Sequence, residues 1–166
     1  MYALAHQSRV LLAGRDLPRA RRQLDECVRT ATQASLKWHL ALARLGTGLV
    51  ERREGNDTAA REVLITSLEL SAEQANRQGM AQCLFGLASL EVIHRPRRAV
   101  LLFAAAGALR RAMGTLMAVT DRQDYETSLL ILRRELDAAT FQAAWAEGQS
   151  LSIEQAIEEA KKGGTS

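Results

Sequence analysis

The sequence repeats itself at an interval of about forty residues, and this period limits the folds that the chain can adopt. A turn-like fragment leading into an alanine-containing helix occurs three times: GRDLPRARRQL from residue 14, GNDTAAREVL from residue 55 and RPRRAVLLF from residue 95. Ala20, Ala60 and Ala99 hold equivalent places near the three helix starts. Such a period is typical of arrays in which one helix pair stacks on the next.

The helices that precede these fragments follow the same period. Each carries a large apolar residue followed by a small one, at Leu4-Ala5, Leu45-Gly46 and Phe85-Gly86. Segments 36–53 and 78–94 are apolar on two sides, whereas segment 17–34 has a single apolar stripe. A helix that is apolar on two sides is expected between two neighbours. We therefore predict three tetratricopeptide-like helix pairs over residues 1–115, stacked as a short superhelical array.

Composition supports an all-α fold. Hydrophobic residues make up 47% of the 166 residues but aromatic residues only 4%, so leucine, alanine and valine must fill the core. The two prolines, Pro18 and Pro96, fall in the first turn of predicted helices, where a missing N–H costs nothing. No segment alternates apolar and polar residues over the length of a strand. The predicted helices span residues 2–13, 17–34, 36–53, 57–76, 78–94, 96–113, 121–136, 138–147 and 153–162.

Residues 116–162 depart from the repeat and are predicted to form a C-terminal helical cap, followed by a disordered tail at 163–166. Capping boxes are expected at Thr120 with Gln123 and at Ser152 with Gln155. Asp137 is the expected cap of a helix that Gly148 ends in a left-handed conformation.

The cap is expected to cover the apolar end of the array. Phe141 and Trp145, four residues apart, should insert their rings there. Leu151, Ile153 and Ile157 should close over the same surface.

Charge, cysteine content and hydropathy indicate the cellular compartment of the protein. The net charge is +3 and the pI about 9.2, but residues 116–166 carry nine acidic and five basic residues, so the basic excess lies upstream. Cys27 and Cys83 are far apart and outside any CxxC motif, which favours two buried free thiols. No apolar run reaches membrane-spanning length and no secretory leader opens the sequence. These features predict a cytoplasmic protein that does not enter membranes.

Residues 97–160 resemble a known family in two places: the alanine-rich helix around Ala104-Ala105-Ala106-Gly107, and FQAAWAEGQSLSIEQAI from residue 141. They are similar to the end of the tetratricopeptide-like region in large bacterial signal-transduction ATPases, including LuxR-type and MalT-like transcriptional regulators. The resemblance implies a sensor or scaffold segment. It also implies that any DNA binding belongs to a helix-turn-helix domain absent from this chain.

The sequence offers no catalytic or cofactor motif. It has no GxxxxGK[ST] phosphate loop, no HExxH and no paired CxxC motifs, and His6, His39 and His94 lie on separate predicted helices. The GTG at residues 46–48 lies inside an amphipathic helix, which favours close helix packing over phosphate binding. We therefore expect no enzyme activity, no metal and no cofactor.

The predicted function is a non-catalytic interaction or sensor module of a bacterial regulator that binds a protein partner or small effector. Mapping a tetratricopeptide groove onto the repeats places eight residues along it: His6, Arg9, Thr47, Val50, Glu51, Leu87, Leu90 and Glu91. Intramolecular packing and self-association are the alternatives for these positions. A basic surface that contacts nucleic acid is the alternative function, carried by arginine clusters at Arg19-Arg22, Arg95-Arg98 and Arg110-Arg111.

Overall fold

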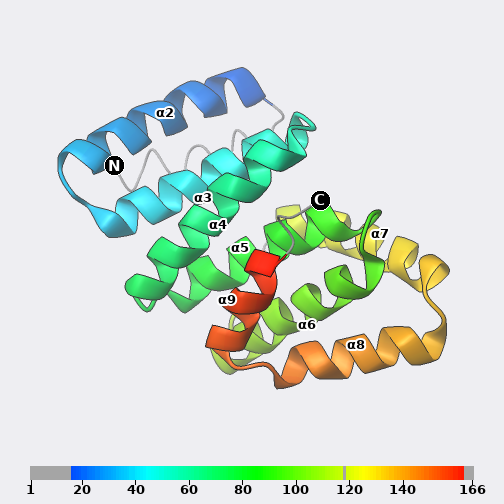
Figure 1. Cartoon of the computed structure of the whole chain (residues 1–166). Coiled ribbons are helices and arrows are strands. Elements are labelled where there is room, and N and C mark those ends of the chain that lie inside the picture. Colours follow the sequence, from blue (N-terminus) through cyan, green and yellow to red (C-terminus); the bar gives the residue numbers. More distant parts are fainter. Residues whose placement is uncertain (1–15, 118, 163–166) are drawn as a thin grey trace. The chain divides into compact units, whose positions relative to one another are not determined.

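The computed structural model describes residues 16–117 and 119–162, and within them the chain forms helices and turns and no strand (Figure 1). The predicted all-α class is therefore confirmed, and helix boundaries differ from the predictions by a few residues. The predicted helix at 2–13 and the predicted tail at 163–166 lie outside the described residues. In chain order the helices are α2 (Leu17–Gln33), α3 (Lys37–Arg53), α4 (Asp57–Glu73), α5 (Arg77–Glu91), α6 (Pro96–Ala112), α7 (Val119–Glu135), α8 (Ala138–Ser150) and α9 (Ile153–Lys161).

Helices α2, α3 and α4 all end in the same way. The second residue beyond each helix is left-handed, with φ of 54° at Ser35, 81° at Gly55 and 50° at Ala75. The next N–H then donates to the carbonyl five residues earlier: Leu36 to Ala31 (2.8 Å), Asn56 to Glu51 (2.9 Å) and Asn76 to Ser71 (2.8 Å). This closure satisfies carbonyls that the helix end leaves without an intrahelical partner. One helix and its turn occupy twenty residues, so the predicted forty-residue period corresponds to a helix pair.

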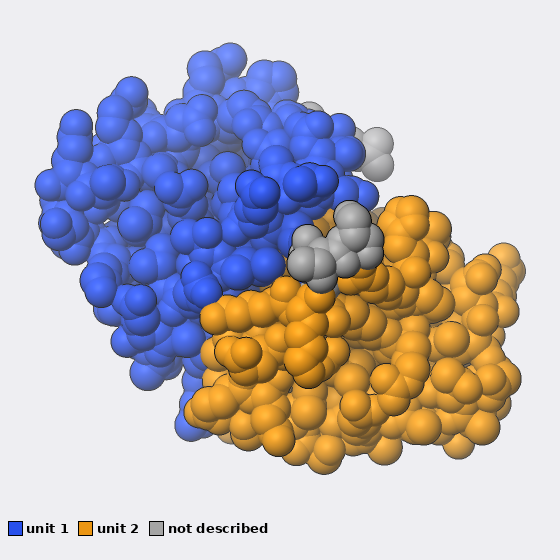
Figure 2. All heavy atoms as spheres, viewed as in Figure 1, with its two compact units in different colours: residues 1–83 blue, residues 84–166 orange. Residues whose placement is uncertain are grey.

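The chain divides into two compact units, residues 1–83 and residues 84–166, which Figure 2 distinguishes by colour. Each is described separately below. The first unit contains α2, α3, α4 and the start of α5. The second contains the rest of α5 and helices α6 to α9. The domain boundary near residue 115 stays a prediction.

Glycines let α3 approach both of its neighbours in the first unit. A Cβ at Gly46 would lie 2.5 Å from the Leu24 Cδ2 atom of α2, and a Cβ at Gly48 would lie 2.7 Å from the Leu64 Cγ atom of α4. Leu24 and Leu64 are themselves buried, with 1% and 0% of their surface exposed. The GTG sequence therefore serves close helix packing, as predicted.

A short chain of hydrogen bonds links α3, α4 and α5 in the same unit. The Ser67 hydroxyl donates to the Ala41 carbonyl at 2.8 Å, and the Cys83 thiol donates to the Ser67 oxygen at 3.3 Å. Burial raises the pKa of the Cys83 thiol to about 12. Cys27 and Cys83 are both buried and free, which confirms the prediction from their spacing.

An arginine of α2 holds two carboxylates at the end of α3. Arg21 Nη1 lies 2.7 Å from Glu51 Oε1, and Arg21 Nη2 also bonds Glu54. The Asn56 amide donates to the other Glu51 oxygen at 2.9 Å. The hydrogen bond from Arg21 is the main cause that lowers the pKa of Glu51, against an opposing effect of burial.

We expect Arg21→Gln to lower the free energy of unfolding at neutral pH by about 1 kcal/mol, because the pair is partly exposed and screened. The folded pKa of Glu51 lies below its unfolded value, so the ion pair stabilises the fold above the unfolded pKa of about 4.3. That stabilisation is lost as pH falls through the folded pKa. Urea unfolding followed by circular dichroism should show the variant and the wild type converging in acid.

Lys37→Gln provides the control, because Lys37 and Glu73 form an ion pair whose side chains are 62% and 52% exposed. It should change stability little at any pH. An Arg21→Gln effect that stays constant down to about pH 3, well below the ordinary glutamate pKa, would contradict the assigned role of Glu51.

Helix α6 is the centre of the second unit. It packs against α7, α8 and α9, and its residues from Ala99 to Ala106 are all buried. Ala99 is completely buried, like Ala20 and Ala60, which hold the equivalent places in the first unit. In the second unit, α7, α8 and α9 therefore all pack against α6.

The connection into α7 differs from the prediction. The helix begins at Val119, so Thr120 lies inside it and cannot be its N-cap, and the expected capping box there is wrong. The box at the start of α9 is confirmed, because the Ser152 hydroxyl accepts from the Gln155 N–H at 3.2 Å and the Gln155 side chain accepts from the Ser152 N–H at 2.9 Å. None of the described helices combines the length and apolar character needed to cross a membrane.

Candidate functional site

A sharp corner joins α7 to α8 and is fixed by Asp137. Its side chain accepts hydrogen bonds from the Thr140 N–H at 2.8 Å and from the Thr140 hydroxyl at 2.6 Å. These bonds hold the pKa of Asp137 below its ordinary value, and they satisfy an N–H that the helix start leaves free. Asp137 is thus the N-cap of α8, as predicted, and the two helices leave the corner as neighbours.

Gly148 decides which face of α8 lies against α6. A Cβ at this position would lie 2.2 Å from the Leu101 carbonyl oxygen and 2.8 Å from the Ala104 Cβ atom. The prediction that Gly148 ends the helix is wrong: α8 continues to Ser150, and Gly148 is a buried point of close approach within it. Ala144, one turn earlier, is buried as well. The small residues of α8 therefore pack on α6.

The aromatic residues of α8 lie on a neighbouring face. Phe141 and Trp145 are only half-buried, and their rings stack on each other with centroids 5.9 Å apart and an angle of 10° between the planes. The expectation that they insert into the apolar end of the array is wrong, because Ala144 and Gly148 already occupy that contact. Leu151, Ile153 and Ile157 are half-buried too.

A hollow of about 410 Å³ opens beside this ring pair, within the second unit. A smaller hollow of about 380 Å³ shares Arg133, Phe141 and Gln142 with it. Volumes in this range are typical of small-molecule sites. We call the larger hollow the α7–α8 groove, and its lining comes from these two helices alone: Tyr125, Leu129, Arg133, Phe141, Gln142, Trp145, Ala146 and Gln149.

One cation and several neutral polar groups line the α7–α8 groove. The Arg133 Cζ atom lies 5.4 Å from the centroid of the Phe141 ring, a distance typical of a cation–π contact. The lining contains no carboxylate. Gln142 and Gln149 add amide groups that can donate and accept hydrogen bonds.

Tyr125 connects the groove to the core of the unit. The centroid of its ring lies 5.4 Å from the Phe103 ring centroid and 6.1 Å from the Phe85 ring centroid. Helices α5, α6 and α7 therefore meet at this aromatic cluster. Burial raises the pKa of Tyr125, and the positive charges of three arginines partly offset that effect: Arg110, Arg111 and Arg133. Three arginines therefore lie close enough to the Tyr125 hydroxyl to act on it electrostatically.

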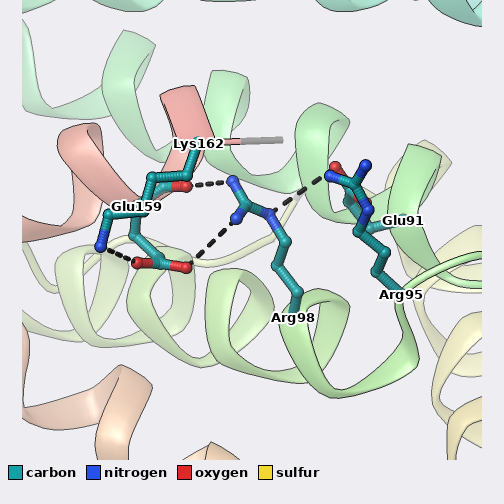
Figure 3. Close-up of polar contacts among 5 residues, drawn as sticks. All are labelled: Glu91, Arg95, Arg98, Glu159 and Lys162. Atoms are coloured by element: carbon teal, nitrogen blue, oxygen red, sulfur yellow. Dashed lines mark hydrogen bonds and ion pairs between the residues drawn. The ribbon is translucent and has the colours of Figure 1, made fainter. Parts of the chain in front are cut away.

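An ion-pair network around the buried Glu91 side chain ties α5, α6 and α9 together outside this groove (Figure 3). The Glu91 side chain is only 5% exposed and lies between Arg95 at 3.9 Å and Arg98 at 3.7 Å. Arg98 also bonds the Glu159 carboxylate at 3.2 Å and the Glu159 carbonyl, and Lys162 reaches the same carboxylate at 2.8 Å. We call these five residues the Glu91 network.

The six described residues of the predicted tetratricopeptide groove have mostly internal contacts. Thr47, Val50 and Glu51 belong to α3, whereas Leu87, Leu90 and Glu91 belong to α5. Val50 and Leu87 are fully buried, Glu91 lies in its ion-pair network, and the Thr47 hydroxyl donates to the Ala43 carbonyl at 3.1 Å. His6 and Arg9 lie outside the described residues. That these residues line one groove stays a prediction.

Among residues 16–117 and 119–162, no group of three or more histidine, cysteine or acidic side chains is placed to hold a metal ion. The lining of the α7–α8 groove offers stacking surfaces, amides and one cation, and it contains no nucleophile paired with a base.

Comparison with known proteins finds similarity to proteins described as transcriptional regulators. It is 30% identical over 157 residues, 94% of its length, to "Putative HTH-type transcriptional regulator Rv0890c" of Mycobacterium tuberculosis (strain ATCC 25618 / H37Rv). It matches "Putative HTH-type transcriptional regulator Mb0914c" of Mycobacterium bovis to the same extent. The chain spans 17% of the length of these relatives. No family model matches it, and no solved structure does.

Proposed function

We propose that this chain is a non-catalytic helical-repeat module of a bacterial transcriptional regulator, and that it binds a small effector or a protein partner. The α7–α8 groove carries the proposal, because it brings a pair of half-buried stacked rings and an exposed arginine together beside a hollow of about 410 Å³. The similarity to mycobacterial regulators over nearly the whole chain supports the regulatory setting.

The narrower family assignment belongs to this proposal as well. The resemblance of residues 97–160 to LuxR-type and MalT-like regulators suggests a cytoplasmic sensor segment, with tetratricopeptide-like repeats and with DNA contacts made by another part of such a protein. Helix pairs that recur every forty residues support this assignment. Under it, the module passes on a signal and performs no chemistry of its own.

The test compares two tryptophans in a thermal-shift screen of metabolites against the 166-residue chain. A true effector raises the melting temperature of the wild type, because binding to the native state stabilises it. Trp145→Ala should abolish that increase. Trp38→Ala is the matched control, since Trp38 lies on α3, is 37% exposed and takes no part in the α7–α8 groove. Equal loss in both variants would contradict a role for the groove.

The basic surface is the alternative function, and its arginines are largely engaged in ion pairs. The structure pairs four of them with carboxylates of their own unit: Arg21 with Glu51 and Glu54, Arg95 with Glu91, Arg97 with Glu147, and Arg98 with Glu91 and Glu159. Arg19 and Arg22 are exposed. Each carboxylate offsets part of the positive charge that a phosphate backbone needs.

We expect no salt-sensitive binding of the chain to a labelled random-sequence DNA duplex in fluorescence anisotropy. A protein that neutralises several phosphates loses affinity by orders of magnitude between about 50 and 200 mM salt. Micromolar binding with that salt dependence would favour the nucleic-acid surface over the effector module.

A further inference from the structure

The α7–α8 groove has the chemistry of a site for one class of small molecule. A small-molecule site generally offers an apolar lining that covers most of the ligand, together with a few polar groups that fix the orientation of the ligand. The apolar lining of the groove consists of the half-buried rings of Phe141 and Trp145 and the side chain of Leu129. Its polar groups are the Arg133 guanidinium and two glutamine amides.

The aromatic pair favours a flat ligand. The Phe141 and Trp145 rings already stack on each other with planes only 10° apart, so a flat ring that packs against this pair can extend the same stack. Aromatic rings pack on such surfaces with offset-stacked or edge contacts that add to simple apolar burial. A planar ring is therefore favoured over a branched aliphatic group of equal size.

The charges favour an acidic ligand. Arg133 is exposed, it lies over the Phe141 ring, and the described part of the chain records no ion pair for it. A guanidinium presents parallel N–H donors that match the two oxygens of a carboxylate. Arg110 and Arg111 add positive charge at Tyr125, on the same lining, and no acidic side chain lines the groove.

Resting on the proposed function, we propose that the α7–α8 groove binds an aromatic carboxylate, with its ring against Phe141 and Trp145 and its carboxylate on Arg133. The Gln142 and Gln149 amides then serve the remaining polar groups of the ligand. The volume of about 410 Å³ suits a molecule of one or two fused rings. An effector of this class would bridge α7 and α8 and oppose any separation of these helices.

Naphthylacetate is the test probe, and the uncharged naphthylacetamide is its isosteric control. Titration into the ¹⁵N-labelled chain is followed through the indole N–H signals of the two tryptophans in ¹H–¹⁵N correlation spectra. The Trp145 signal should shift saturably with a Kd on the order of 1 mM, as expected for a ligand of this size. The Trp38 signal should stay in place, which provides an internal control. The amide should bind at least fivefold more weakly than the acid.

Two matched substitutions on α7 test whether Arg133 binds the carboxylate of the ligand. Arg133→Met removes the cation but keeps a long side chain, and it should abolish the difference between acid and amide. Arg134→Met, at the next position and also exposed, changes the net charge identically and should preserve that difference. Both residues are on the surface, so both variants are expected to fold.

The outcomes separate this inference from the proposed function. Equal binding of acid and amide, or equal effects of the two arginine variants, overturns the carboxylate assignment while leaving a binding groove in place. A Trp145 signal that no probe shifts also overturns the aromatic carboxylate, but a screening compound that stabilises the wild type and not Trp145→Ala would still support the module. Salt-sensitive DNA binding together with no Trp145 shift would contradict both.

Discussion

Gly148→Ala should lower the free energy of unfolding by about 2–3 kcal/mol, although alanine is the better helix former by about 1 kcal/mol. The new Cβ would lie 2.2 Å from the Leu101 carbonyl oxygen, which belongs to the backbone of α6 and cannot rotate away. Helix α8 must therefore move off α6, and overpacking of this kind typically costs 1–3 kcal/mol or more beyond the propensity gain. Chemical denaturation of the variant and the wild type measures the difference.

Gly107→Ala is the matched control on α6 and should have the opposite sign. Its Cβ would meet only the Arg111 Nη1 atom at 3.5 Å, an ordinary contact. The substitution should raise stability by up to about 1 kcal/mol through helix propensity. If both alanines were stabilising, the close approach of α8 to α6 would be incorrect.

These glycines show why the helix pattern could be predicted but the role of one glycine could not. Period, capping residues and proline positions are local, so they identified the helices and the corner at Asp137. Gly148 has two sequence-compatible roles, as a left-handed helix end or as a close contact inside a helix. Only the position of the Leu101 carbonyl, 47 residues earlier in the chain, distinguishes them.

The candidate site was partly visible in the sequence. Phe141 and Trp145 stood out as two large rings four residues apart, but they were expected in the core rather than beside a groove. Two stripes with a spacing of four residues mark this hollow in the sequence: Tyr125, Leu129 and Arg133 on α7, and Phe141, Trp145 and Gln149 on α8. Each stripe follows one helix face. That the two stripes line one hollow depends on which face of α8 packs on α6, and therefore on Gly148.

The ion pairs of Glu91 could also be predicted only in part. Its place in the repeat suggested a groove, yet its carboxylate is only 5% exposed and is held by two arginines. The signal was present in the sequence, because Arg95 follows at i+4 and the RPRR fragment supplies Arg98. The full network was not predictable, since it depends on α9 bringing Glu159 to Arg98 from 61 residues later in the chain.

Arg98→Ala should therefore cost about 3–5 kcal/mol of unfolding free energy, the range found when one partner of a buried ion pair is removed. The side chain is 13% exposed and is the part of the Glu91 network that joins α5, α6 and α9. Its loss leaves Glu91 with Arg95 at 3.9 Å as its remaining pair in the network, and it removes the hydrogen bond to the Glu159 carbonyl. Arg97→Ala, one residue earlier on α6, is the control. It removes a pair with Glu147 whose side chains are 54% and 46% exposed, and should cost less than about 1 kcal/mol.

A double substitution distinguishes a missing partner from lost packing. In Glu91→Leu with Arg98→Met, no buried charge is left without its partner, and apolar replacements of buried pairs are often neutral. The double variant should then be more stable than Arg98→Ala alone, with strongly non-additive effects. Equal stability of Arg98→Ala and Arg97→Ala would show that the Glu91 network contributes little. A double variant less stable than Arg98→Ala would show that the ion pair itself, rather than the cost of leaving Glu91 under-compensated, stabilises this junction of three helices.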